Sequence, residues 1–328
     1  MNKKVIFGLK AFRKLYSKVF GVDSIVQLDC EQDADVASRI IYDELQKETP
    51  SMIARFGATE MNVMINYLGI KGEDKNWIKY IRNKSLPWWW EENRMQQMQR
   101  WSGFFPPTEA KIQQFCELML RDMQEVNVLG SWIPDEFYFE EQLSRVKKVK
   151  LILLEPYMSS KPWSSFLKGK KVLVIHPFAE LIEQQYQKRE TLFENPEVLP
   201  EFELQTIPAI QSLGGESNGF TDWFHALQWM KDEIDKRDYD ICLIGAGAYG
   251  FPLAAHVKRQ GKNAIHLGGA LQLLFGIKGN RWEDPFYGVE QWGLTKGFYT
   301  ELMNEYWVRP TNKNKPKNAN EVEGSCYW

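Results

Sequence analysis

The chain has 328 residues, of which 44% are hydrophobic and 14% aromatic, and its formal net charge at pH 7 is −2. This composition supports a packed core and excludes a largely disordered chain. No run reaches the roughly 18 to 20 apolar residues of a membrane-spanning helix, and the four cysteines have the spacing of neither a zinc site nor a disulfide framework, so we expect a cytoplasmic protein.

Basic charge is concentrated at the N-terminus. Residues 1–22 contain six lysine or arginine residues and no acid, with apolar residues between them at the spacings of an amphipathic helix. We treat residues 1–32 as a basic amphipathic segment. It is suited to the inner face of an anionic membrane; a docked helix or a dimer arm is the alternative. Nucleic acid is not an expected partner, because the rest of the chain is acidic on balance.

An α/β domain is predicted for residues 33–308. Its first elements are a helix over 33–48 and a short strand over 51–56. Gly57 then forms a turn into a second helix. This order places Glu60 in the first turn of that helix.

The next segment, residues 74–106, is rich in tryptophan and includes Trp88–Trp90. Its aromatic rings would suit stacking on a sugar, a lipid interface or simple packing. A helix capped by Thr108 is predicted over 108–125.

The rest of the domain alternates strands with helices. Several of the strands are near-continuous apolar runs, as strands covered on both faces must be. The pattern predicts a Rossmann-like, doubly wound and mostly parallel sheet, with helical segments at the N-terminus. The strand candidates are residues 126–129, 149–154, 171–175, 203–207, 239–244 and 263–267.

A glycine-rich loop lies within one predicted strand–helix–strand unit, residues 240–267. Glycines allow a tight turn and a close approach of backbone N–H groups to a diphosphate. The acid that would bind the ribose of NAD is missing after Ile265, so a different diphosphate fits better; pure helix–sheet packing is the alternative. The donor-binding residues expected here are Gly245, Gly247, Tyr249 and Gly250.

A second candidate group follows the first strand, where Arg55, Gly57 and Glu60 leave its carboxyl end. Ligands of open α/β sheets bind at this edge. Arg55 and Gly57 are expected to contact the donor, and Glu60 is expected to act as a general base or a metal ligand. In the alternative interpretation, Glu60 interacts with the positive end of the helix dipole and forms an ion pair with Arg55.

These motifs together resemble the GT-D fold glycosyltransferases, and more closely a bacterial polysaccharide-locus branch of them. Arg55, Gly57 and Glu60 match the early motif of that family, and residues 240–269 match its late strand–loop–helix. The resemblance implies a nucleotide-sugar donor and a glycan or glycolipid acceptor. Ala58 stands where the family has the first carboxylate of its metal site. We therefore expect transfer without a metal, with Glu60 as the one ligand left for Mn²⁺ or Mg²⁺.

Two histidines are further catalytic candidates. His176 and His266 each close a predicted strand, and an imidazole can carry a proton near neutral pH. The chain ends in a polar tail, residues 309–328, whose last two aromatic residues suggest docking on the body or on a partner.

The sequence thus predicts a cytoplasmic glycosyltransferase, peripheral at the membrane, that acts in cell-surface polysaccharide or glycoconjugate biosynthesis. Two alternatives stay open. One is an NAD(P)-dependent oxidoreductase that uses the glycine loop. The other is a non-catalytic nucleotide- or glycan-binding assembly factor.

Overall fold

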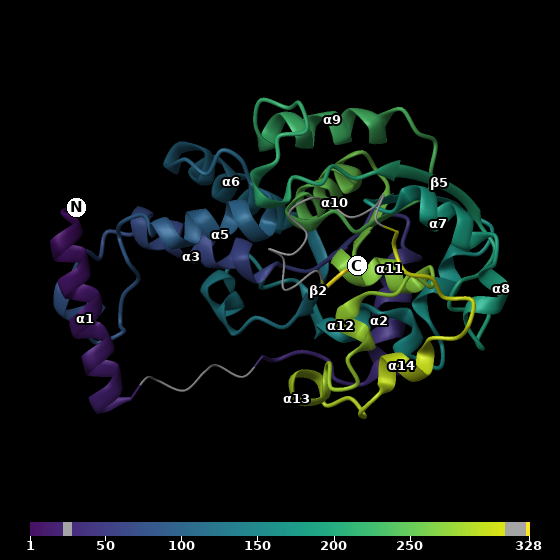
Figure 1. The fold of residues 1–328 in the computed structure, drawn as a ribbon, viewed down its shortest axis with the longest axis horizontal. Helices are drawn as coiled ribbons and strands as arrows, with labels where there is room; N and C mark the ends of the chain where they lie inside the picture. The colour runs from purple at the N-terminus through teal and green to yellow at the C-terminus, as the bar shows by residue number, and fades with distance from the viewer. Residues whose placement is uncertain (22–27, 312–325) are drawn as a thin grey trace.

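The computed structural model describes residues 1–21, 28–311 and 326–328. Within them, seven strands form one parallel sheet in the order β3-β2-β1-β7-β6-β4-β5 (Figure 1). The predicted α/β, doubly wound architecture is therefore confirmed. The strands are β1 Met52–Ala54, β2 Val126–Ser131, β3 Lys147–Lys150, β4 Lys171–His176, β5 Glu203–Pro208, β6 Ile241–Ile244 and β7 Asn263–His266.

One predicted strand is wrong in part. The strand expected over 149–154 ends at Lys150, and the apolar residues after it form the 3-10 helix η3 (Leu151–Leu154). β2 is the one strand of the sheet that pairs with β3, and that ladder ends where Ser131 pairs with Lys150; on the other side, Glu31 forms an isolated bridge with Val149. Beyond Lys150 there is no strand partner left, so η3 buries its leucines against helix α2 instead.

Two hydrophobic cores separate the sheet from its two layers of helices. One layer lies over the face that buries Ala54, Leu129 and Ile244, and the other lies over the face that buries Ile53, Val174 and Leu243. The first layer contains α3 (Ala58–Lys71), α5 (Glu92–Ser102), α6 (Glu109–Asp122), α9 (Trp223–Asp235) and α10 (Gly250–Arg259). The second contains α2 (Ala34–Leu45), α7 (Ala179–Tyr186), α8 (Arg189–Leu192), α11 (Leu271–Leu274), α12 (Asn280–Glu283), α13 (Val289–Trp292) and α14 (Phe298–Leu302).

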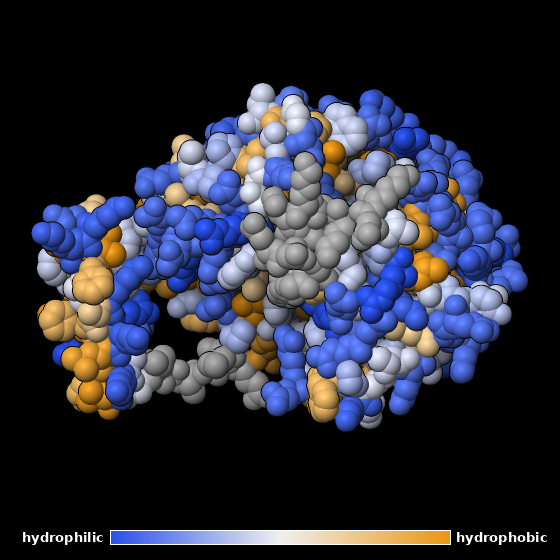
Figure 2. Space-filling view, in the orientation of Figure 1, coloured by the Kyte–Doolittle hydropathy of each residue, from blue (hydrophilic) through white to orange (hydrophobic). Residues whose placement is uncertain are grey.

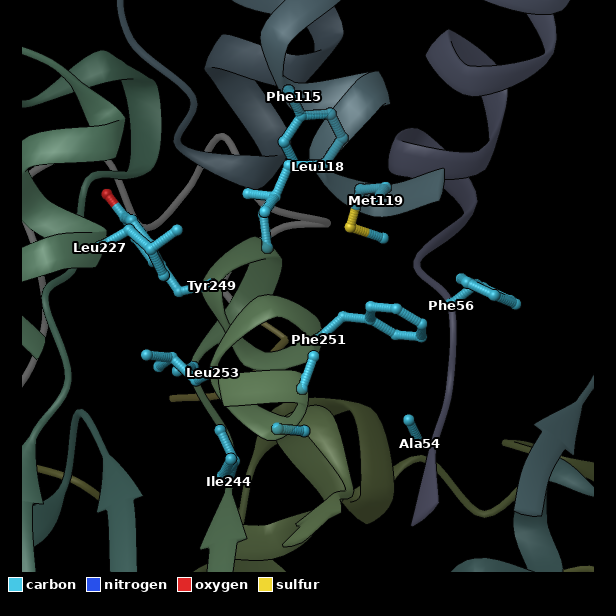
Figure 3. Close-up of a cluster of buried hydrophobic side chains, with 14 of the residues drawn as sticks. Ala54, Phe56, Phe115, Leu118, Met119, Leu227, Ile244, Tyr249, Phe251 and Leu253 are labelled. Atoms are coloured by element: carbon cyan, nitrogen blue, oxygen red, sulfur yellow. The ribbon is translucent and has the colours of Figure 1, made fainter. Parts of the chain in front are cut away.

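Figure 3 shows the first core where α6 and α10 meet above the sheet. The rings of Phe56 and Phe251 stack there with centroids 4.8 Å apart. Phe56 follows β1, and Phe251 lies in the first turn of α10. This stack fixes the chain leaving β1 against the helix that follows β6.

Short 3-10 helices connect many of these elements. Two of them, η7 and η8, follow β6 and β7 directly and so lie at the carboxyl edge of the sheet. The others described are η1 Met123–Glu125, η2 Pro134–Phe139, η4 Pro156–Met158, η5 Trp163–Leu167 and η6 Leu213–Gly215, beside η7 Gly247–Tyr249 and η8 Gly268–Ala270.

The N-terminal helix α1 (Lys3–Phe20) packs on α4 (Trp77–Ile81) at one end of the molecule (Figure 1). The tryptophan-rich segment joins this contact through Trp89, while Trp90 stacks on Tyr67 of α3 at 6.2 Å. Both tryptophans therefore pack against neighbouring helices of the protein. No helix in the described part of the chain is long and apolar enough to cross a membrane.

The chain returns to the sheet at its C-terminus. Cys326 and Trp328 are buried, and the backbone N–H of Arg281 donates a hydrogen bond to the carbonyl of Cys326 (3.1 Å). The last residues therefore dock on the body of the protein, which is one of the two arrangements expected from the sequence; the other was docking on a partner. Most of the predicted polar tail, residues 312–325, lies outside the described residues.

Candidate functional site

The candidate site lies at the carboxyl edge of the parallel sheet. The chain leaves β4 outward, toward the edge strand β5, but leaves β6 inward, toward β7. A doubly wound sheet opens a crevice where such connections diverge. His176 and Gly245 flank this point, and the segments that follow β1 and β7 adjoin it.

Arg55, directly after β1, is held by its own loop and by aromatic neighbours. Its Nε and Nη2 atoms donate to the carbonyl of Phe56 (3.1 and 2.8 Å), and its guanidinium lies 5.1 Å from the ring centre of Trp132. Burial lowers the pKa of Arg55, and the positive charge of Arg281 adds to that effect. Among the described residues no carboxylate forms an ion pair with Arg55. A buried guanidinium in this state attracts an anion.

Glu60 lies in the first turn of α3, as predicted, with only 8% of its surface exposed. Its carboxylate packs against Gly57, so that any side chain at position 57 would collide with it. Glu60 is not within ion-pair distance of Arg55, and its carboxylate has no hydrogen bond within the described ranges. It is therefore held in place by packing, with its acceptor atoms uncommitted.

A two-carboxylate metal site is not formed at this turn. Ala58 cannot supply a ligand, and the described part of the chain contains no cluster of three or more histidine, cysteine, aspartate or glutamate side chains that suits a metal ion. The residues present therefore do not fit the family's metal site, and none of the steps proposed below uses a metal.

The three glycines of the loop have different roles. A Cβ at Gly245 would lie 2.5 Å from the ring of His176, and one at Gly250 would collide with the ring of His266. Gly245 and Gly250 are thus required for packing. Gly247 is different, because it has a φ of 52° and open space where its side chain would lie. Of the three glycines, Gly247 is the one that is exposed to solvent.

Tyr249, expected to bind the donor, is buried in the helical layer. Its ring stacks on Trp223 with centroids 4.8 Å apart, and its hydroxyl shares a 2.7 Å hydrogen bond with Ser212. These contacts hold the start of α10 against α9. Tyr249 is therefore buried, whereas Gly247 of the same loop is exposed.

His176 and His266 lie beneath the loop. The Nδ1 atom of His176 accepts a hydrogen bond from the backbone N–H of Phe178 (3.0 Å), and that of His266 pairs with the carbonyl of Ile244 (3.2 Å). Burial lowers the pKa of each to about 3; for His266 the charge of Arg55 contributes too. Both rings are therefore neutral at physiological pH and support the glycine loop from below.

A cavity at this edge brings in residues that the sequence did not single out. Arg55 and Arg281 both line it, together with Glu155 and the rings of Tyr287 and Tyr327. Its volume is about 50 Å³, room for a small anion or one or two water molecules. No motif marks Arg281 or Glu155, because α12 and η3 reach the cavity only through the tertiary fold.

Glu155 forms the wall across from the arginines. Its Oε2 atom accepts hydrogen bonds from the hydroxyls of Tyr157 (2.6 Å) and Tyr299 (2.8 Å). Burial nevertheless raises the pKa of Glu155 to about 7. A mixture of neutral and charged forms of Glu155 therefore exists near pH 7, in a cavity that two guanidinium groups also line.

Tyr327 closes the cavity from the side of the C-terminal residues. Its ring packs so closely on Gly269 that no side chain would fit there, and the guanidinium of Arg281 lies 5.0 Å from the ring centre. The backbone carbonyl of Tyr327 accepts a hydrogen bond from Gln272 (3.2 Å). Tyr327 thus fills the space next to Gly269 in the wall of the cavity.

No protein-family model and no curated protein matches the sequence. Two solved structures are similar to the chain at 11% identity and a TM-score of 0.35. One is described as a selenomethionine-substituted structure of domain of unknown function 1792. The match spans 83% of this chain and 99% of that structure's chain. The other is described with the statement that this highly conserved domain has a distinct glycosyltransferase fold. That match spans 92% of this chain and 99% of the other chain. Likeness at this TM-score does not establish a shared fold.

Proposed function

We propose that the protein is a glycosyltransferase that moves a sugar from a nucleotide-sugar donor to an acceptor hydroxyl. The observation that carries the proposal is that Arg55, Glu60 and Gly247 all follow strands at the carboxyl edge of one doubly wound sheet. Nucleotide sugars need a site for a diphosphate, and the acceptor needs a base. Both kinds of group occur at this edge.

The diphosphate is assigned to the arginine side of the site. Arg55 and Arg281 line the same cavity, so their guanidinium groups offset the negative charge that develops as the nucleoside diphosphate leaves. Gly247 presents exposed backbone at the start of the segment that leads into α10, where the helix dipole also favours negative charge.

Glu60 is assigned as the general base for the acceptor hydroxyl. Its carboxylate is positioned by α3 and by Gly57 and has no competing hydrogen bond within the described ranges. In the transfer step, Glu60 takes the hydroxyl proton, the acceptor oxygen bonds to the anomeric carbon, and the bond from that carbon to the diphosphate oxygen breaks. His176 and His266 hold the glycine loop and move no proton in this scheme.

The sequence motifs add the biological setting. They resemble a bacterial polysaccharide-locus branch of the GT-D glycosyltransferases, so we propose a glycan or glycolipid acceptor in cell-surface polysaccharide or glycoconjugate assembly, at the cytoplasmic side of the membrane. Donor sugar and linkage are outside what these residues specify.

Thermal stability in the presence of ligands tests the proposal. UDP, GDP, and their sugar derivatives should raise the melting temperature more than NAD or NADP does, because the cavity is cationic and the ribose-binding acid of a dinucleotide enzyme is missing. Slow hydrolysis of the correct nucleotide sugar should follow without any acceptor. A larger shift with a dinucleotide would overturn the transferase assignment, and nucleotide binding without hydrolysis would point to an assembly factor.

A further inference from the structure

Helix α1 is fixed to the body of the protein by one of its faces. Leu9 is only 4% exposed and packs between Tyr80 and Trp89. Arg13 lies 4.5 Å from the ring centre of Tyr80, and its Nε donates to the Oδ1 of Asn83 (2.6 Å). The orientation of the helix is therefore set by contacts to α4 and the tryptophan-rich segment.

The face of α1 that points away from the body is also apolar. Phe12, Leu15 and Val19 are 61%, 57% and 64% exposed, and their spacing places them along one side of the helix. Phe20, which ends the helix, is also exposed (72%). Figure 2 shows the hydrophobic surface of α1 at the outer edge of the molecule. We call Phe12, Leu15 and Val19 the outer strip.

Lysines flank the outer strip. Lys18 lies one turn from Leu15, and Lys4 lies on the same side of the helix about three turns toward its N-terminus; Lys14 precedes Leu15 and lies farther round the helix. Within the described ranges none of these three lysines pairs with a carboxylate, whereas Lys10, on the inner side, binds Glu91 (2.6 Å). No acid occurs in residues 1–22. The outer side of α1 thus combines an apolar strip with uncompensated positive charge.

We propose that the outer strip docks the protein on an anionic phospholipid bilayer. The apolar side chains would enter the boundary between headgroups and acyl chains, and the three lysines would contact lipid phosphates. Each lysine near such a surface strengthens binding about fivefold. A second copy of the chain fits less well, because pairing two outer strips would bring their flanking lysines together. The site edge and α1 belong to one folded body, so docking would hold the enzyme beside a lipid-linked acceptor.

Co-sedimentation with vesicles tests this proposal on the full chain. The wild-type protein should bind phosphatidylcholine–phosphatidylserine vesicles and bind pure phosphatidylcholine at least tenfold more weakly. The triple variant Phe12→Ser, Leu15→Ser, Val19→Ser should lose at least tenfold in binding, and so should Lys4→Gln, Lys14→Gln, Lys18→Gln, whose residual binding should no longer depend on salt.

Phe286→Ser is the matched control. Phe286 is 62% exposed, like the residues of the outer strip, but lies between α12 and α13. It should leave vesicle binding unchanged. Substitution is preferable to deletion of α1, because deletion would also expose Tyr80 and Trp89. Circular dichroism on each variant confirms that α1 remains folded.

The proposal is overturned if both triple variants bind vesicles as well as the wild type does. It is also overturned if the wild-type protein does not bind the vesicles; a dimer in light scattering that the serine variant abolishes would then assign the outer strip to a second copy of the chain. Nucleotide binding, measured on the same variants, should not change. The membrane surface and the transferase assignment can therefore fail separately.

Discussion

The carboxylate of Glu60 lies against the backbone of Gly57, in the space that a side chain at position 57 would need. This contact joins the turn after β1 to the first turn of α3. It positions an acid at the sheet edge without a hydrogen bond from the described residues. The arrangement suits a group that must accept a proton from a substrate.

Glu60→Gln should lower turnover about 100-fold or more, because glutamine keeps the shape of the side chain but cannot take up the acceptor proton. The melting temperature should change little. Glu109→Gln is the matched control, since Glu109 likewise occupies the first turn of a helix, α6, but is exposed to solvent. If both substitutions change stability equally and turnover is unchanged, Glu60 only stabilises the helix through its dipole and is not the base.

The same assay tests the metal. Since Ala58 and Glu60 do not form a two-carboxylate site, we expect full transfer activity in EDTA. Activity that returns only when Mn²⁺ or Mg²⁺ is added would contradict this expectation.

Gly247→Ala should weaken the binding of a nucleoside diphosphate at least tenfold, because a methyl group would occupy the open side of the loop. Gly261→Ala is its control: this glycine also has a positive φ, 81°, and open space, but lies after the far end of α10. Both variants should lose about 1 kcal/mol of stability from backbone strain. Calorimetry should find weaker nucleotide binding in Gly247→Ala alone.

Arg55→Lys should also reduce nucleotide affinity at least tenfold, although the charge is kept. Lysine cannot reproduce the two hydrogen bonds to Phe56 or the flat contact with Trp132. Arg259→Lys serves as the control. Arg259, at the end of α10, forms ion pairs with Asp122 and Glu125 and does not line the cavity. If the control weakens binding as much as Arg55→Lys does, the diphosphate does not lie at Arg55.

Tyr327→Ala should increase nucleotide affinity. The ring of Tyr327 fills the space above Gly269, so the wild-type protein must displace it before a donor enters a cavity of about 50 Å³. A variant without the ring avoids that cost, and titration should give a lower Kd. A higher Kd would mean instead that the tyrosine stacks on the bound donor.

Glu155 predicts an unusual dependence of stability on pH. Its pKa is about 7 in the folded protein and 4.5 ordinarily, so between these values the folded state holds a proton that the unfolded state releases. The free energy of unfolding therefore falls as the pH rises from 4.5 to 7, and this loss should be about 1–3 kcal/mol smaller in Glu155→Gln. Urea unfolding at several pH values measures it.

For Glu44 we expect the opposite dependence of stability on pH, because its pKa is lowered. Burial raises its pKa, but hydrogen bonds from Lys47 and Lys147 outweigh burial and lower it. Glu44→Gln should therefore cost stability at neutral pH and cost less as the pH falls through the lowered pKa. Parallel pH profiles for both glutamine variants would contradict the assignment for Glu155.

The local parts of the site could be predicted from the sequence. The turn at Gly57 and the loop at Gly247 are short strand–turn–helix units, whose glycines and apolar runs are adjacent in the chain. The reason for other glycines could not be predicted. Gly245 is small because His176 packs on it, and that contact depends on the pairing of β4 with β6.

The cavity residues were beyond the reach of sequence patterns for a similar reason. Arg281 and Glu155 lie on short helices and turns without periodicity, and only the tertiary fold brings them to one cavity. The end of β3 at Lys150 was missed because apolar residues 151–154 suit a strand, and only the length of β2 limits the ladder.

The position of β1 has a consequence for synthesis of the protein on the ribosome. β1 is an inner strand, flanked by β2 on one side and by β7 on the other, with Met52 opposite both Val126 and Ala264. A nascent chain can pair β1 with β2 early, but the second edge stays open until nearly the whole sheet has been translated. An apolar strand with an open edge invites pairing with other chains. Protection of that edge by chaperones during translation should therefore govern how much native protein is recovered.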